Sequence, residues 1–185
     1  VSLSSKVGKA CYIPIGHNSK KCINKDVVLN KLKPLLEDSS IKKIGQNIKF
    51  DFIVLFKHGI TISTMEDTML MSYVLDAGKN RHNMDILSEI HLGHKTTSFK
   101  DLVGIGKKQI NFSEVEVEAA KNYAAEDADI TFRLYKKFLV TLKNEKLMNI
   151  YETFEKPLIK ILAHMEMCGI KLDNKFLNKL STNFQ

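Results

Sequence analysis

The chain has 185 residues, of which 44% are hydrophobic and 26% charged, with only 9 Gly and 3 Pro. This composition excludes intrinsic disorder, which requires low hydrophobicity, and collagen-like or low-complexity proteins, which require a biased composition. No apolar run reaches the roughly 18 residues that a membrane-spanning helix needs, so we expect no membrane partner. The length suits one globular domain together with a fragment of a second.

The chain is basic, with 28 Lys and Arg against 21 Asp and Glu, which gives a formal net charge of +7 at pH 7. A basic surplus favours polyanionic partners, and nucleic acid is the first candidate. Charge alone is equally consistent with a basic protein that has no such partner. The three cysteines have neither metal-ligand spacing nor the even number of a disulfide framework, so we expect a reduced, cytoplasmic protein. The first residues lack a signal-peptide layout and an initiator Met, and we expect a piece of a longer protein.

Short strands and helices alternate in the first third of the chain. Residues 9–15 predict a strand that ends in a turn, and residues 27–36 have apolar residues at helical spacing. A short buried strand is expected at 41–45. Asn47 then suits the N-cap of a helix, and Gly59 suits its C-terminal stop. This alternation favours an α/β domain with a small sheet.

Helices dominate the middle of the chain. A second short strand is expected at 60–65, after which Asp67 caps a helix that ends near Gly78. Asn83 begins another helix, which Gly93 ends. Residues 94–109 predict a basic loop.

A long helix is expected after this loop. Ser113 and Glu116 have the S-x-x-E spacing of a capping box, and the helical pattern that follows continues to about Asn144. The character of the sequence changes near Tyr151, where a further helix with an early proline begins. We therefore predict a first domain at 1–150 and the truncated start of a second at 151–185.

Two positions have the residue types that can bind a cation. Tyr123 and Asp127 are four residues apart on the long helix and project from one face. A carboxylate can bind a hard cation while a neighbouring phenol holds a water, although a simple hydrogen bond at a helix surface would need the same spacing. Asp51 follows Asn47 by one turn among apolar residues, and it could equally be an ordinary acid at a helix start.

Taken together, several segments resemble the 3′–5′ proofreading exonuclease domain of the bacterial DNA polymerase I family, the family A DNA polymerases. Two of them resemble the second and third exonuclease motifs of that family, GQNIKFD at 45–51 and YAAEDAD at 123–129. Others match in order and spacing: DTMLMSYVLD at 67–76, NRHNMDILSE at 80–89 and GIGKKQINF at 104–112. A last segment, EKPLIKILAHMEMCGIKLD at 155–173, resembles the start of the polymerase domain of the family.

The resemblance implies a ribonuclease-H-like α/β fold, with a small mixed sheet flanked by helices and followed by the helical start of the polymerase domain. It implies two Mg²⁺ ions held by four carboxylates, with Mn²⁺ or Zn²⁺ as other possibilities. Asp51 and Asp127 would be two of these metal ligands, and Tyr123 would orient the attacking water. Two cations about 3.5–4 Å apart neutralise the charge that develops on a phosphodiester and lower the pKa of bound water.

The resemblance also implies contacts with a DNA 3′ end. Gln46 and Asn47 match polar positions near the end of the strand, and Arg81 matches a position that contacts phosphate. Phe99 matches an aromatic residue that stacks on a base of frayed single-stranded DNA. Stacking tolerates any base, which suits removal of any mismatch. Phe99 considered alone could instead anchor its loop in the core.

The chain departs from the family in one respect. The family has a first motif, an Asp-x-Glu pair, on a strand just upstream of the region that matches Val1, and residues 1–15 contain no acidic residue. The first hypothesis is a proofreading module within a monomeric DNA-directed DNA polymerase of replication and repair, linked to the polymerase domain of the same chain. The alternatives are a non-catalytic scaffold that binds DNA and a stand-alone exoribonuclease of the same superfamily.

Overall fold

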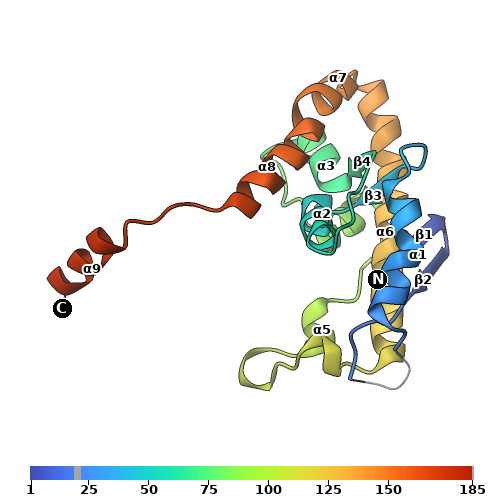
Figure 1. Cartoon of the computed structure of the whole chain (residues 1–185). Coiled ribbons are helices and arrows are strands. Elements are labelled where there is room, and N and C mark those ends of the chain that lie inside the picture. Colours follow the sequence, from blue (N-terminus) through green and yellow to red (C-terminus); the bar gives the residue numbers. More distant parts are fainter. Residues whose placement is uncertain (19–21, 185) are drawn as a thin grey trace.

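The computed structural model describes residues 1–18 and 22–184, and four strands in it form two separate pairs (Figure 1). Strands β1 (Ser2–Lys6) and β2 (Lys9–Tyr12) are antiparallel and pair Ser2 with Tyr12. Strands β3 (Lys43–Gly45) and β4 (Met65–Asp67) are parallel and pair Lys43 with Met65. The described strands therefore include both the antiparallel and the parallel pairing that a mixed sheet requires.

Nine α-helices lie in the described residues, at α1 (Lys25–Glu37), α2 (Ile48–Phe56), α3 (Thr68–Asp76), α4 (Met84–Leu92), α5 (Phe99–Val103), α6 (Val117–Asn144), α7 (Met148–Ile150), α8 (Lys156–Cys168) and α9 (Asn174–Asn183). Two 3-10 turns, Gly106–Lys108 and Phe112–Glu114, precede α6, and a π-helical segment, Tyr151–Glu155, precedes α8. No helix of the described residues is long and apolar enough to span a membrane.

Helix α6 is the central element of the fold. It contacts β1, β2 and β3, as well as α3 and α4 (Figure 1). Its buried face includes Ile130, Leu134, Phe138 and Leu142, none of them more than 1% exposed. Because these residues recur every four positions, they lie on one face of the helix, and this period of the sequence is the cause of the packing. The first residues of the same helix lie beside the short helix α5 and a smaller core around Val103.

The carboxylate of Asp67 joins the first turns of α2 and α3. It caps α3 by accepting hydrogen bonds from the N–H groups of Met69 and Leu70, at 2.8 and 3.4 Å. It also accepts hydrogen bonds from the backbone N–H groups of Asn47 and Ile48, with 3.1 and 2.9 Å between oxygen and nitrogen. The predicted cap is therefore confirmed, and the same side chain fixes the start of α2, where Asp51 lies.

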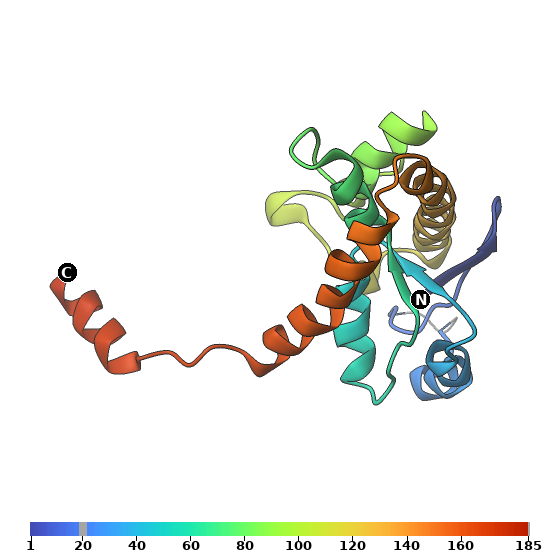
Figure 2. The same cartoon turned by 90° about the horizontal axis from the view of Figure 1, so that it is seen from above.

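The residues after 150 pack against the residues before them. Tyr151 is fully buried in the same core cluster as Leu134 and Phe138. Ile159 and Ala163 of α8 are buried against α2 (Figure 2). Helix α9 instead stands apart at the end of an extended segment. The domain boundary at residue 150 stays a prediction.

The predictions at two helix starts differ from the structure to different degrees. Asn47 does occupy the N-cap position of α2, but it lies in the left-handed region with φ 57° and makes no side-chain capping bond, since Asp67 satisfies the backbone there. The capping box before α6 is formed by Asn111 and Glu114, in a 3-10 turn, instead of Ser113 and Glu116.

The strand predicted at 60–65 begins only at Met65, and strand β1 has no counterpart among the predictions. The basic loop predicted at 94–109 contains the short helix α5, which Ser98 caps by accepting the Lys100 N–H. By contrast, the helix between Asn83 and Gly93 is confirmed, with Gly93 in the left-handed C-cap conformation at φ 63°.

Candidate nuclease site

Tyr123 and Asp127 lie together on α6, as their spacing predicts. The Tyr123 hydroxyl is hydrogen-bonded to the Asp127 carboxylate, and burial, with Asp127 nearby, raises the pKa of Tyr123 above its ordinary value. Among the described atoms, Oδ1 of Asp127 is buried without a hydrogen-bond partner. Burial raises the pKa of Asp127 to about 6, and the charges of Glu126 and Asp85 add to this effect, while the bond with Tyr123 opposes it. This carboxylate therefore has one oxygen available for a cation.

Asp51 lies in the first turn of α2 with its side chain reaching solvent. Desolvation by the surrounding protein raises the pKa of Asp51 to about 6, and the nearby charge of Asp67 contributes to the shift. A hydrogen bond with its own backbone N–H opposes the shift. A carboxylate in this setting gains from a cation that stabilises its charged form.

The structure brings Tyr123 and Asp127 into contact but gives Asp51 no hydrogen bond or ion pair with either of them among the described residues. Helices α2 and α6 both contact β3, and they approach it from different sides in both views (Figures 1 and 2). No group of three or more His, Cys, Asp or Glu residues that could hold a metal is present in residues 1–18 and 22–184. The shared metal site of Asp51 and Asp127 stays a prediction.

Phe99 lies at the start of α5, next to Tyr123. Its side chain is 44% exposed, and its ring centroid is 6.0 Å from that of Tyr123. It stacks on Phe112 with the same 6.0 Å separation and an angle of 15° between the ring planes. Phe99 is thus partly exposed and also held by two neighbouring rings, and its contact with DNA stays a prediction.

Glu126 is a residue that the sequence reasoning missed. Its Oε1 is 2.7 Å from Nε2 of His94, and its Oε2 accepts the Thr97 N–H at 2.9 Å. These bonds lower the pKa of Glu126 although partial burial opposes them. The signal that could have identified it is its position immediately before Asp127 in the third motif. Through these two hydrogen bonds, Glu126 attaches residues 94–97, which lead to Phe99, to helix α6.

The polar residues predicted to contact DNA have different surroundings. Both ends of the Gln46 amide are engaged, because Nε2 donates to the His82 carbonyl at 2.8 Å and Oε1 accepts the Thr68 hydroxyl at 2.5 Å. Arg81, next to His82, is exposed. The DNA contacts of Gln46, Asn47 and Arg81 stay predictions.

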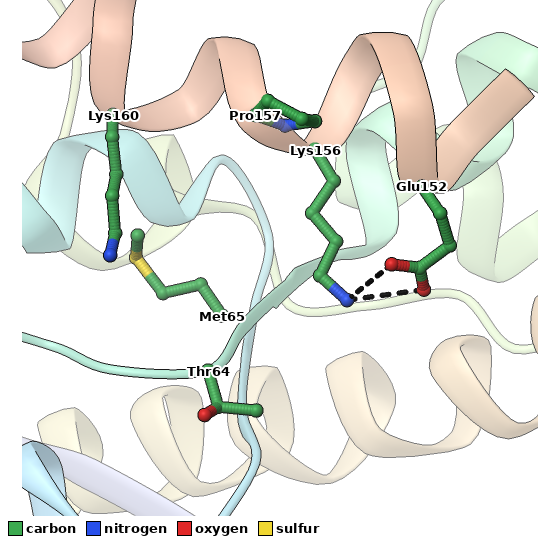
Figure 3. Close-up of a pocket in the computed structure, with 6 residues that line it drawn as sticks. All are labelled: Thr64, Met65, Glu152, Lys156, Pro157 and Lys160. Carbon is green, nitrogen blue, oxygen red and sulfur yellow. Dashed lines mark hydrogen bonds and ion pairs between the residues drawn. The ribbon is translucent and has the colours of Figure 1, made fainter. Parts of the chain in front are cut away.

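A hollow lies between the start of β4 and α8 (Figure 3). Thr64 and Met65 form one side, and Lys156 and Lys160 of α8 form the other. Lys156 donates to both carboxylate oxygens of Glu152, at 3.1 and 2.9 Å. None of Asp51, Tyr123 and Asp127 lines this hollow, so we do not place the active site there.

Known proteins resemble the chain over nearly its whole length. The profile of a 3′–5′ exonuclease family of A-type DNA polymerases matches residues 1–143. DNA polymerase I of Rhizobium leguminosarum is 46% identical over 153 residues, a match that covers 83% of this chain and 15% of that protein. DNA polymerase I of Pseudomonas aeruginosa is 40% identical over 184 residues, with 96% of this chain and 20% of that protein covered. The chain thus spans a fifth or less of these relatives.

The fold also has a counterpart among solved structures. Brucella melitensis NrnC with bound Mg²⁺ superposes with a TM-score of 0.60 at 22% identity, and the match covers 77% of this chain and 67% of that one. At this identity the likeness shows the fold alone. Together with the exonuclease profile, it confirms the expected ribonuclease-H-like α/β fold.

Proposed function

The chain belongs to the 3′–5′ exonuclease family of A-type DNA polymerases, and we propose that it is a proofreading module that hydrolyses the 3′-terminal phosphodiester of single-stranded or frayed DNA. The products would be deoxynucleoside monophosphates, and the parent protein would join this module to a polymerase domain of the same chain. The observation that carries the proposal is the pairing of Tyr123 with Asp127, whose buried Oδ1 has no partner among the described atoms.

The residues present fit a divalent cation. Carboxylate oxygens are the ligands that Mg²⁺ prefers, and Asp127 has an unpartnered buried oxygen of this kind. Asp51 has a raised pKa, and a cation would stabilise its charged form. We propose that these two residues hold Mg²⁺, and the same oxygen donors would accept Mn²⁺ or Zn²⁺. Such cations supply charge neutralisation at the phosphate and lower the pKa of a bound water.

Tyr123 has the properties of a residue that orients water. Because its pKa is raised, the hydroxyl stays protonated at neutral pH and can both donate to Asp127 and accept from a water. Its ring is held by Phe99 and Phe112, with centroids 6.0 and 6.3 Å away. The phenol therefore has one defined direction in which a water can be placed for attack.

The substrate would be held by stacking and by phosphate contacts. The partly exposed ring of Phe99 can stack on the terminal base beside Tyr123. Base stacking on an aromatic ring contributes about 1–3 kcal/mol per base and does not select the base. We propose that Arg81 and Asn47 contact the backbone of the same strand. Gln46 would also lie near the 3′ end of the strand, and its hydrogen bond to the His82 carbonyl would help to position the neighbouring Arg81.

A second candidate function is a scaffold that binds DNA without cutting it. It is favoured by the absence of any group of three potential metal ligands from the described residues. The Asp-x-Glu pair expected upstream of Val1 decides between the two functions, because it would complete the four carboxylates. A stand-alone exoribonuclease would instead degrade RNA without an attached polymerase, whereas the relatives reported above are DNA polymerases.

The test uses a protein extended upstream to include an Asp-x-Glu pair, with a 5′-labelled single-stranded DNA and Mg²⁺. We expect stepwise shortening from the 3′ end, which the substitution Asp127→Ala abolishes. Asp26→Asn, at an exposed acid in the first turn of helix α1, is the matched control and should leave the rate unchanged. Equal cleavage by the Asp127→Ala variant would refute the assigned role. DNA binding without cleavage by the extended protein would favour the scaffold, and faster cleavage of RNA would favour the exoribonuclease.

A further inference from the structure

Phe112 contacts both aromatic residues of the proposed site. Its ring stacks on Phe99 at 6.0 Å with an interplanar angle of 15°, and it meets Tyr123 at 6.3 Å with an angle of 60°. Since Phe99 and Tyr123 are themselves 6.0 Å apart, the three rings form a closed triangle. A shift of Phe112 would therefore move both neighbours, which come from separate helices.

Buried residues hold Phe112 in place, while Phe99 is partly exposed to solvent. Phe112 packs against the buried cluster of Val103, Val115 and Ala120. It also contacts the His17 ring at 5.5 Å, and Nδ1 of His17 is 3.0 Å from the Val115 carbonyl oxygen. Phe99, by comparison, is 44% exposed. A rigid ring thus supports an accessible one, as a base-stacking platform requires.

The segment that leads to Phe99 has a second attachment, which is polar. Glu126 holds His94 and Thr97 through its two carboxylate oxygens, at 2.7 and 2.9 Å. Because Glu126 directly precedes Asp127, this attachment fixes the segment next to the proposed metal ligand. One aromatic and one polar contact therefore set the position of Phe99 relative to Tyr123 and Asp127.

We infer that Phe112 and Glu126 are positioning residues, which hold the Phe99 ring so that a terminal base stacked on it delivers its phosphodiester to Tyr123 and Asp127. This inference rests on the proposed function and extends it to two residues that do not touch the metal. Its physical basis is preorganisation, since a ring that is already ordered loses less entropy when the base binds. A small displacement of the base would also misplace the reacting phosphate.

The test measures stacking directly in the absence of cleavage. The probe is a single-stranded oligodeoxynucleotide with 2-aminopurine at its 3′ end, whose fluorescence falls when the base stacks, titrated with the 185-residue chain in EDTA. Phe99→Ala should weaken binding by about 5- to 150-fold and abolish the quenching. Phe112→Leu keeps the apolar volume but removes the aromatic ring, and we expect it to lose at least half of the quenching. Phe112→Tyr keeps the ring and should quench like the wild type.

Glu126→Ala supplies an independent arm that leaves the aromatic core intact, and it should also reduce the quenching while the melting temperature stays within a few degrees of the wild type. The matched controls are Phe154→Ala, at a 62% exposed ring on the distant π-helical segment, and Glu118→Ala, at an exposed residue that pairs with Lys121 on the same helix. Both controls should quench like the wild type.

Wild-type quenching by the folded Phe112→Leu and Glu126→Ala variants, with loss in Phe99→Ala, would overturn the inference and leave the proposed function standing. Unchanged quenching in Phe99→Ala would also overturn it, because no stacked base would exist to be positioned. If the quenching follows the expected pattern but the extended protein shows no Mg²⁺-dependent cleavage, Phe112 and Glu126 position a stacked base, and the exonuclease activity is refuted. The two failures are thus distinguishable.

Discussion

The carboxylate of Asp67 accepts a hydrogen bond from the backbone N–H of Ile48, with 2.9 Å between Oδ2 and the nitrogen. The two residues are 19 positions apart, and this contact fixes the first turn of α2 against the first turn of α3. Asp67 is only 1% exposed. The geometry of Asp51, in the same first turn of α2, therefore depends on a buried acid that is itself no part of the proposed chemistry.

We predict that Asp67→Ala lowers the free energy of unfolding by about 2–4 kcal/mol, because it leaves the donors of two helix starts without their acceptor. Urea denaturation followed by circular dichroism measures this change. Asp26→Ala removes an exposed first-turn acid of α1 and should cost less than about 0.5 kcal/mol. A loss equal to that of the control would show that Asp67 does not join the two helices.

A second prediction concerns the attachment of the π-helical segment that precedes α8. The buried Tyr151 hydroxyl donates to Oε2 of Glu66 at 3.1 Å and accepts the Asp67 N–H at 3.0 Å. Tyr151→Phe should reduce the free energy of unfolding by about 1–3 kcal/mol, since it leaves buried polar groups unpaired. Tyr73→Phe, at a ring that is 47% exposed, is the control and should change it little. Equal effects would contradict the structural role assigned to Tyr151.

The sequence predicts the helices better than the strands, for a physical reason. Long amphipathic segments such as α6 carry many repeats of their period, and Gly93 and Asp67 mark helix ends through local conformational preferences. Strand β1, Ser2–Lys6, has little of the β-branched or aromatic character typical of strands, and its position depends on pairing with β2 and packing on α6.

The candidate site was predictable only in part. The i, i+4 spacing of Tyr123 and Asp127 is a local property of one helix, and the structure bears out their contact. The contacts of Phe112 and Glu126 join residues from separate segments, so no periodicity could indicate them. The engagement of Gln46 with His82, 36 residues away, is likewise a product of tertiary packing.

The third prediction is a pH dependence of stability. The native pKa of Asp127 is raised to about 6 from an ordinary value of 3.8, so the folded protein retains a proton that the unfolded chain has already lost between these values. Its contribution to stability is therefore present at low pH and is lost as the pH rises through about 6. Asp127→Asn, which cannot ionise, should be more stable than the wild type at pH 8, by about 1–2 kcal/mol after allowance for partial solvent screening.

This difference should become small near pH 4, where residue 127 of the folded wild type is largely protonated and therefore uncharged, as it is in the variant. Thermal unfolding at pH 4, 6 and 8 in EDTA measures it, with Asp26→Asn as the control for an exposed acid. A stabilisation by Asp127→Asn that is the same at all three pH values would contradict the linkage to ionisation.

The fourth prediction concerns metal binding. A cation that binds the folded protein alone raises its melting temperature in proportion to the logarithm of its concentration. We expect millimolar Mg²⁺ or Mn²⁺ to stabilise the wild type at pH 8. The stabilisation should be smaller at pH 5, because Asp51 and Asp127 have pKa values of about 6 and are largely protonated at that pH. Both Asp51→Asn and Asp127→Asn should weaken this stabilisation. An unchanged response in both variants would place the cation elsewhere.

The most direct measurement is a crystal structure of the upstream-extended protein grown with Mn²⁺ and recorded at the manganese absorption edge. The account predicts anomalous density within coordination distance of carboxylate oxygens of both Asp51 and Asp127, with the Tyr123 hydroxyl facing the same position. The shared metal site would be contradicted if the carboxylates of Asp51 and Asp127 were both ordered with no anomalous peak between them, or if manganese were bound only elsewhere on the surface.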